Sequence, residues 1–167
     1  MSKVKDEITP AEYLERGLLN QIDFYDTFST TNKKDNLEEI AHLILDNPPK
    51  WIKSLFTLRN KIAKLIGLKT EKPADYNERF EVGGYIGFFK IFSITQNEIV
   101  LGANDSHLNF RAIVANKIED LHNIKFITLV QYNNSTGRIY MSVVKPFHRL
   151  VVKRMVKNAH KLKFEIK

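Results

Sequence analysis

The spacing of apolar residues changes along this chain, and the period at each place predicts the type of element. Residues 9–17 carry the capping-box pattern of a short helix, with Thr9 as the cap, Pro10 at the first helical position and Gly17 at the end. In residues 21–29 the apolar side chains recur at every second position, which predicts a strand. Its apolar side carries Ile22, Phe24 and Phe28, and its other side carries Asp23, Tyr25 and Thr27.

Two amphipathic helices are predicted after this strand. Asn36 is a suitable cap, and Glu38 and Glu39 lie in the first turn near the positive end of the helix dipole, so we expect a helix through Asp46. The prolines in residues 47–49 end that helix and begin the next one. The second helix has an apolar stripe at spacings of four, three, four and three, formed by Trp51, Leu55, Leu58, Ile62 and Leu65.

From residue 84 onward the pattern changes to short strands separated by turn residues. The predicted strands are residues 85–95, 98–102, 107–116, 124–132 and 138–145. Connections this short, including a hairpin loop over residues 133–137, imply antiparallel neighbours. Pro146 then begins a long helix over residues 147–163. Its apolar side carries Leu150, Val151, Met155, Val156, Ala159 and Leu162.

This order of elements predicts one α+β domain over residues 1–167, with residues 1–18 as an N-terminal extension that contains the short helix. A sheet of about six antiparallel strands has one apolar face to cover, and the two shorter helices between its first and second strands cannot cover it alone. The long C-terminal helix can, so we expect a curved sheet wrapped around that helix. The space between them is the predicted hydrophobic cavity.

The charge of the chain is concentrated near its C-terminus. The net charge is +7, but residues 1–140 hold 18 basic and 18 acidic residues, whereas residues 141–167 hold eight basic residues and one acid. A basic solvent face on an amphipathic helix accounts for this excess, and an acidic partner is the alternative. The polar start of the chain and the shortness of its apolar runs predict a cytoplasmic protein with no membrane span.

Several segments resemble a bacterial family known only as domain-of-unknown-function family 2867. They are residues 47–51 (NPPKW), 58–60 (LRN), 66–68 (IGL), 87–89 (GFF), 98–102 (EIVLG), 105–111 (DSHLNFR), 137–141 (GRIYM) and 145–149 (KPFHR). The order of elements resembles the helix-grip fold of the START-like and pollen-allergen-like superfamily, which includes polyketide cyclase-like proteins. The resemblance implies this fold, and it implies no known activity.

Polar and apolar residues alternate around the start of the predicted strand at residues 107–116. Asp105, His107 and Arg111 would share one side of that strand, and an Asp–His pair at this spacing could orient an imidazole for acid–base catalysis. With Tyr140, these are the four candidates for catalysis. A surface ladder of cross-strand polar pairs is the interpretation that we favour. The scattered histidines and the absence of cysteine predict no metal site and no cofactor.

The candidates for ligand binding are aromatic and aliphatic residues of the predicted cavity wall. They are Phe88, Phe92, Phe110, Val114, Tyr140, Val151 and Met155. Arg59 lies at the edge of the apolar stripe of its helix, where it could reach a ligand carboxylate or anchor the helix to the sheet. The pattern leaves open which side of each strand faces inward.

Four functions remain open at this point. The first is binding of a small apolar or amphipathic, lipid-like molecule in the cavity, and the second is a structural or interaction domain without a pocket. The third is an enzyme of the cyclase or hydratase type, and the fourth is a binder of nucleic acid or acidic protein. Nucleic acid is disfavoured because aromatic residues are not interleaved with the C-terminal lysines. Ligand binding ranks first, and the oligomeric state is not predicted.

Overall fold

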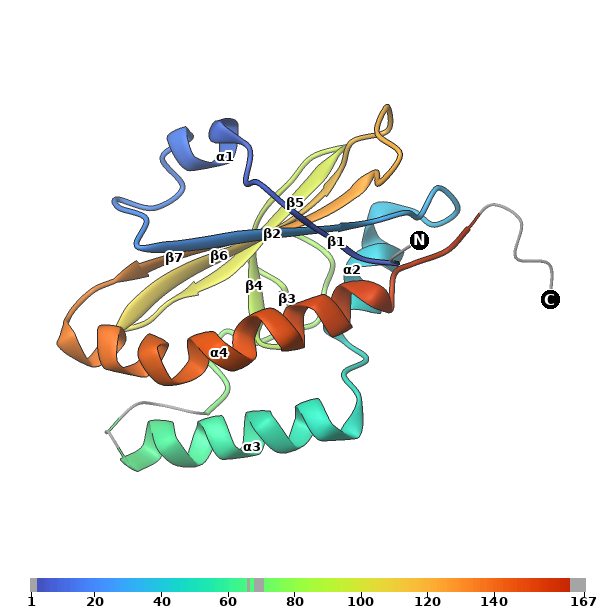
Figure 1. The fold of residues 1–167 in the computed structure, drawn as a ribbon. Coiled ribbons are helices and arrows are strands. Elements are labelled where there is room, and N and C mark those ends of the chain that lie inside the picture. Colours follow the sequence, from blue (N-terminus) through green and yellow to red (C-terminus); the bar gives the residue numbers. More distant parts are fainter. Residues whose placement is uncertain (1–2, 66, 68–70, 163–167) are drawn as a thin grey trace.

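The structure is a computed structural model that describes residues 3–65, 67 and 71–162. The fold is built on an open antiparallel sheet (Figure 1). Within these residues seven strands pair in the order β1-β2-β7-β6-β5-β4-β3. They are β1 (Lys5–Glu7), β2 (Phe24–Thr30), β3 (Tyr85–Ile86), β4 (Phe89–Ile94), β5 (Glu98–Asn104), β6 (Leu108–Asn116) and β7 (Ile124–Tyr132). The helices are α1 (Ala11–Glu15), α2 (Leu37–Leu45), α3 (Lys50–Leu65) and α4 (Ser135–Lys157). The predicted α+β class and antiparallel pairing are therefore confirmed.

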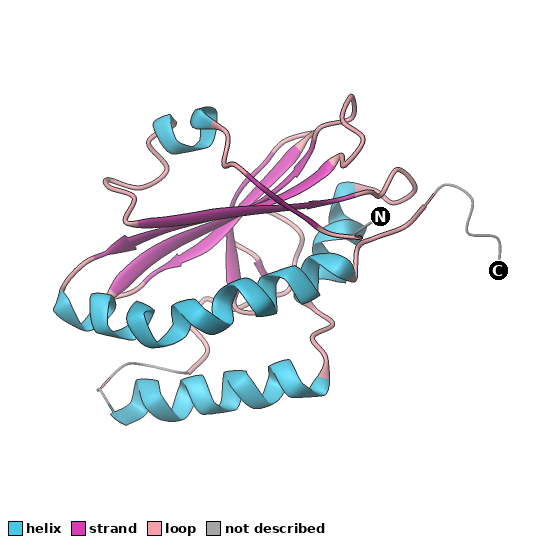
Figure 2. Cartoon of the chain, in the orientation of Figure 1, coloured by secondary structure: helices cyan, strands magenta, loops and turns pink. Residues whose placement is uncertain are grey.

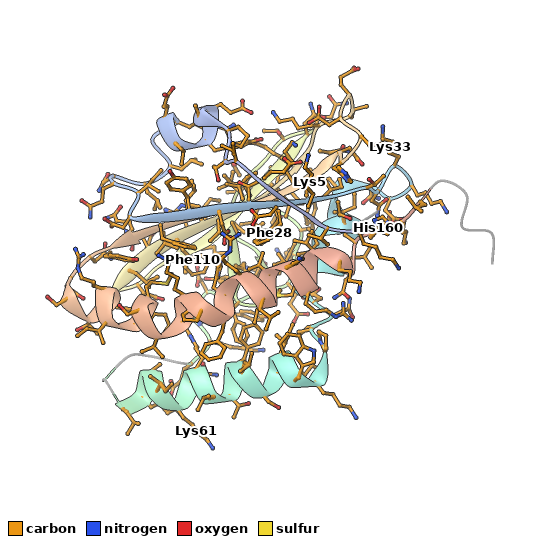
Figure 3. All side chains as sticks on the ribbon, viewed as in Figure 1. Lys5, Phe28, Lys33, Lys61, Phe110 and His160 are labelled. Carbon is orange, nitrogen blue, oxygen red and sulfur yellow. The ribbon has the colours of Figure 1, made fainter. Side chains whose placement is uncertain are left out.

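Helices cover both faces of the sheet (Figure 2). One apolar cluster joins α2 and α4 to one face and includes Phe28, Val114 and Met155. A second cluster lies on the opposite face, where Tyr13 of α1 packs against Ile113 and other residues of the central strands. Successive side chains of a strand point to opposite faces, so neighbouring residues contribute to different clusters. Figure 3 shows Phe28 and Phe110 between the sheet and α4.

The starts of the first two helices differ in how they are capped. Asn36 caps α2 as predicted, because its side chain accepts a hydrogen bond from the Glu39 amide. The Glu39 carboxylate also accepts one from the Asn36 amide, which completes a capping box that was not predicted. The prediction of Thr9 as the cap of α1 is wrong. Pro10 holds that position without a side-chain bond, and the Thr9 hydroxyl instead lies 2.7 Å from the Thr27 hydroxyl.

The C-terminal helix begins a full three turns earlier than the sequence predicts. The predicted loop at residues 133–137 and strand at 138–145 are wrong, because α4 runs unbroken from Ser135 to Lys157. The Asn134 side chain accepts a hydrogen bond from the Gly137 amide and caps the helix. The β-branched and aromatic residues of this segment favour a strand by propensity, but packing against the sheet overrides that preference.

α3 forms an outer layer beside α4, away from the sheet (Figure 1). Its buried residues are Ile52 and Ala63, and each directly follows a residue of the predicted stripe in the sequence. The stripe residues Trp51, Leu58 and Leu65 are 41%, 52% and 86% exposed, so the prediction of the buried side is wrong by about one position. Apolar residues occur on more than one side of this helix, which makes its periodicity ambiguous.

Candidate functional site

An acidic side chain is buried among aromatic residues on the face of the sheet that α4 covers. Asp26 shares this side of β2 with Phe24 and Phe28, and its side chain is 1% exposed. Neither carboxylate oxygen has a hydrogen-bond partner among the described protein atoms. Desolvating a carboxylate without such partners costs several kcal/mol, on the order of 2–7 kcal/mol even for an uncharged polar group. The fold therefore maintains an unfavourable group at this position.

Two more polar groups meet Asp26 in this layer. Thr128 is its partner in the β2–β7 register, and the buried Thr128 hydroxyl also lacks a protein partner. From α4, Nε2 of His148 lies 3.3 Å from Oδ2 of Asp26. That distance is within ion-pair range, but the pair does not meet hydrogen-bond geometry, and Nε2 is unpartnered. We call Asp26, Thr128 and His148 the buried polar cluster.

Aromatic rings and cations surround the buried polar cluster. The Phe24 ring packs edge-on against the imidazole of His148, with 5.4 Å between ring centroids. Nζ of Lys145 lies 5.3 Å from the Phe24 ring centroid, and the Arg149 guanidinium carbon lies 5.3 Å from that of Phe28. Two positive charges of α4 thus lie against the aromatic rings that flank Asp26 along β2. The site therefore offers acceptor oxygens in a largely apolar setting with two cations beside its rings.

A second polar contact lies at the start of α4. The ring of His107 packs edge-on against Tyr140 at 5.1 Å, and Nε of Arg59 donates to the Tyr140 hydroxyl at 2.5 Å. Burial lowers the pKa of His107, the positive charge of Arg59 lowers it further, and the charge of Asp105 partly opposes both. Both ring nitrogens of His107 lack protein partners among the described residues. A neutral imidazole is thus favoured here.

Gly137 allows this contact to form. A Cβ atom built on Gly137 would lie 1.9 Å from the carbonyl oxygen of His107, far inside van der Waals contact. The first turn of α4 can therefore approach the start of β6 only with glycine at this position.

A family model described as "Protein of unknown function (DUF2867)" matches residues 18–155, which is most of the chain. The chain belongs to the DUF2867 family. No curated protein and no solved structure matches the sequence significantly. The resemblance noted from the short segments is confirmed at the level of this family.

The four catalytic candidates of this DUF2867 protein do not form one site. His107 and Tyr140 are in contact, and Asp105 is close enough to influence the pKa of His107. Arg111 points to the opposite face of the sheet, where its guanidinium lies 4.0 Å from the Phe92 ring and donates to the Phe110 carbonyl oxygen. Burial lowers the pKa of Arg111. The sheet separates it from the other three residues.

The ligand-binding candidates are also divided between regions. Phe110, Val114, Tyr140, Val151 and Met155 belong to the clusters on the α4 face. Phe92 packs on the α1 face, because it follows Ile91 in β4 and neighbouring strand residues point to opposite faces. Phe88 is 65% exposed beside Phe56 of α3. Arg59 contacts Tyr140 from α3. Side chains fill the layer beneath α4 where Val114 and Met155 pack.

Two hollows in the described part of the DUF2867 chain lie outside that layer. One, of about 560 Å³, lies beside α2 and is lined by polar residues that include Asp35 and His42. The other, of about 390 Å³, lies between the N-terminal segment, α3 and α4. Among the described residues there is no group of three or more His, Cys, Asp or Glu that could hold a metal ion. No helix of the described residues is long and apolar enough to cross a membrane.

The buried polar cluster was not predicted, although the sequence contains a signal for it. Asp26 has the same strand parity as Phe24 and Phe28, so the alternation that predicts β2 also places a carboxylate on its apolar side. An acid at such a position is rarely buried unless it is paired or functional. His148 gave a weaker signal, because it lies at the predicted start of the helix, whereas α4 begins at Ser135.

Proposed function

We propose that this DUF2867 protein binds a small amphipathic molecule between the sheet and α4, with the buried polar cluster as the anchor for its polar group. The supporting observation is that Asp26, Thr128 and His148 meet in one place without mutual hydrogen bonds. Buried polar groups in proteins are nearly always partnered, so an unpartnered set is a candidate for a ligand. Phe110, Val151 and Met155 then contribute to the apolar wall.

The chemistry of the anchor restricts the ligand class. Asp26 supplies acceptor oxygens, so the ligand needs a hydrogen-bond donor, such as a hydroxyl group, and a carboxylate would be repelled. Pro146 lies two residues before His148 and has no amide hydrogen, which removes one intrahelical bond from α4. We propose that α4 yields at this weak point to admit the ligand. A helix-grip architecture and a cytoplasmic location remain part of the proposal, the first supported by the curved packing of sheet on α4.

Octanol and octanoate test the proposal as a matched pair. Both are unbranched molecules of eight carbons, and only octanol has a hydroxyl that can donate a hydrogen bond to Asp26. We expect octanol to raise the melting temperature of the wild-type protein in a concentration-dependent manner. Octanoate should have a much smaller effect at equal concentration.

Two valine variants separate binding at this site from general effects of an alcohol. Thr128→Val removes a hydroxyl of the buried polar cluster, whereas Thr27→Val removes a buried hydroxyl on the opposite face. The octanol response should fall in Thr128→Val and persist in Thr27→Val. Equal responses in both variants, or no response in the wild type, would contradict ligand binding here and favour a structural domain without a pocket.

Acid–base catalysis is the second candidate, and the Asp26–His148 contact is the observation that favours it. A carboxylate close to an imidazole nitrogen is an arrangement that acid–base catalysts use to orient the ring. A hydratase would then use His148 to move a proton at a bound unsaturated ketone. Hydration of such ketones should be lost in His148→Gln while octanol still stabilises the variant. Turnover that persists in His148→Gln would contradict this role.

A further inference from the structure

The hollow between the N-terminal segment, α3 and α4 combines positive charge with exposed apolar surface. Four of its lining residues are basic, namely Lys3, Lys153, Arg154 and Lys157. Val4, Trp51 of α3 and Leu150 of α4 supply the apolar part of the lining, and none of the described lining residues is acidic. The hollow is open to solvent, and Trp51 and Leu150 are 41% and 58% exposed. It differs in this respect from the buried polar cluster, whose charged group is acidic.

The positive charge extends along both helices that form the hollow. α3 carries five Lys and Arg residues and α4 carries six, and neither helix contains Asp or Glu. The remainder of the chain has more acidic than basic residues, since the net charge of the whole is +7. Figure 3 shows Lys61 pointing outward from α3, away from the sheet. One side of the molecule is thus strongly basic.

Exposed apolar side chains follow the same two helices. On α3 they are Trp51, Leu58 and Leu65, and on α4 they are Ile139, Val143, Phe147 and Leu150. The spacings of seven and seven on α3, and of four, four and three on α4, place each set along one side of its helix. The helices run antiparallel, since Arg59 reaches Tyr140 while Trp51 shares the hollow with Leu150. The two exposed stripes therefore meet at the hollow.

We propose that the α3–α4 face, defined by these exposed residues and the hollow, docks on a membrane surface that contains anionic lipid. Helices with Lys and Arg beside exposed Trp, Phe and Leu bind in the plane of a bilayer interface, with the apolar side chains inserted and the cations near lipid phosphates. The four basic residues of the hollow would receive a phosphate group. Trp51 at its rim has the amphipathic ring that such interfaces favour.

Charge and side-chain type favour a bilayer over the other occupants of such a face. A second copy of the chain would bring two basic surfaces together, and like charges repel. Nucleic acid would use the cations and the rings of Trp51 and Phe147, but it would leave the exposed leucines, isoleucine and valine without a partner. An anionic bilayer uses both the cations and the aliphatic residues.

Vesicle binding of the full chain tests this proposal with a built-in reporter. Trp51 is the only tryptophan in the chain, so its emission reports on the hollow directly. We expect vesicles of phosphatidylcholine with phosphatidylglycerol to shift this emission to shorter wavelengths and to sediment the protein. Pure phosphatidylcholine vesicles should bind much less, and added salt should weaken binding by screening the charges.

A pair of charge-reversal variants localises the binding. Lys153→Glu with Lys157→Glu reverses two charges at the hollow, and we expect binding to fall by at least about twentyfold, given the usual contribution of each basic residue near an anionic surface. Lys33→Glu with Lys34→Glu makes the same charge change in the loop after β2, which lies far from α3 in Figure 3. This control should reduce binding much less. Leu58→Ser should weaken vesicle binding without changing its dependence on salt.

Three results would overturn the proposal. The first is no binding to the anionic vesicles at low salt, and the second is an equal loss in the two charge-reversal variants. The third is tight binding of a single-stranded oligonucleotide by a protein that does not bind vesicles, which would assign the face to nucleic acid. None of these results bears on the octanol experiment, because the buried polar cluster lies on the other side of α4.

Discussion

Lys125 and Asp26 are both buried and charged, and they lie on neighbouring strands, but they point to opposite faces of the sheet. On the α1 face, Nζ of Lys125 is 2.8 Å from Glu7 and 3.2 Å from Asp120, and Glu7 also accepts a hydrogen bond from Ser29. On the α4 face, Asp26 has the ion-pair contact with His148, and its carboxylate accepts no hydrogen bond from any described residue. One charge is fully partnered and the other is not.

The threonines repeat this difference between the two faces. Thr27 exchanges a hydrogen bond with Thr9 on the α1 face, whereas the hydroxyl of Thr128 on the α4 face has no partner among the described atoms. Partnered groups of this kind stabilise a fold, and unpartnered ones reduce its stability. We infer that the polar groups of the α1 face serve structure, and that those of the α4 face are kept at a cost for function.

The largest expected effect comes from removing Lys125, which breaks its ion pairs with Glu7 and Asp120. Burial would lower the pKa of Lys125, but hydrogen bonds to Glu7 and Asp120 outweigh it and raise that pKa. Lys125→Met leaves Glu7 half-buried without its cation, and we expect a loss of about 3 kcal/mol in the free energy of unfolding. Urea denaturation at neutral pH measures it. A loss below about 1 kcal/mol would mean that the α1-face pair is as dispensable as a surface ion pair.

Removing the unpartnered pair should act in the opposite direction. We expect Asp26→Val with His148→Leu to raise the free energy of unfolding by about 2 kcal/mol, because the variant no longer buries a carboxylate without donors. The same variant should lose its response to octanol. Destabilisation by a similar amount would show that Asp26 and His148 contribute to the fold, and the contrast between the faces would disappear.

The two threonines give the most closely matched comparison. Valine has nearly the shape of threonine and lacks the hydroxyl, so each substitution removes only polar interactions. Thr27→Val leaves the Thr9 hydroxyl buried and unpartnered, and should cost about 1–2 kcal/mol. Thr128→Val removes an unpartnered hydroxyl and should be neutral or slightly stabilising. Equal changes in the two melting temperatures would contradict the comparison.

The smallest effect concerns the pH dependence contributed by His107. Its pKa is lowered in the folded protein from the ordinary value of 6.5, so the unfolded chain binds the proton more readily. The contribution of neutral His107 is fully present above pH 6.5 and is lost as pH falls through the folded pKa. Relative to His107→Phe, the wild type should lose up to about 1.4 kcal/mol per pH unit. A pH-independent difference between the two proteins would be inconsistent with this burial.

The sequence predicted most of the sheet, because apolar segments of strand length bounded by turn residues indicate strands even where both sides are buried. It also predicted α2, whose capping box is a local interaction between Asn36 and Glu39. It did not predict the start of α4, where Ile139, Tyr140 and Val143 have strand propensity and only packing on the sheet decides for helix. Local signals specify local structure, and tertiary contacts decide the ambiguous segments.

The candidate site could be predicted only in part for the same reason. Tyr140 and His107 were proposed from separate segments, and their contact depends on the correct start of α4. Asp26 and His148 are 122 positions apart, and their approach follows from the placement of α4 across β2, which no local pattern specifies. Arg111 was assigned to this group because alternate residues of a strand share one side. His107 precedes β6, however, so this alternation does not extend to it, and Arg111 points to the other face.

The sheet ends at both edges in very short strands, three residues in β1 and two in β3. A strand edge recruits other chains through its free amide and carbonyl groups, and a template of two or three residues is too short to hold a foreign strand. The short edge strands therefore disfavour edge-to-edge or fibrous self-association through the β-sheet. The helical side of the protein, where α3 and α4 present their exposed residues, has no such protection and is where we propose contact with other molecules.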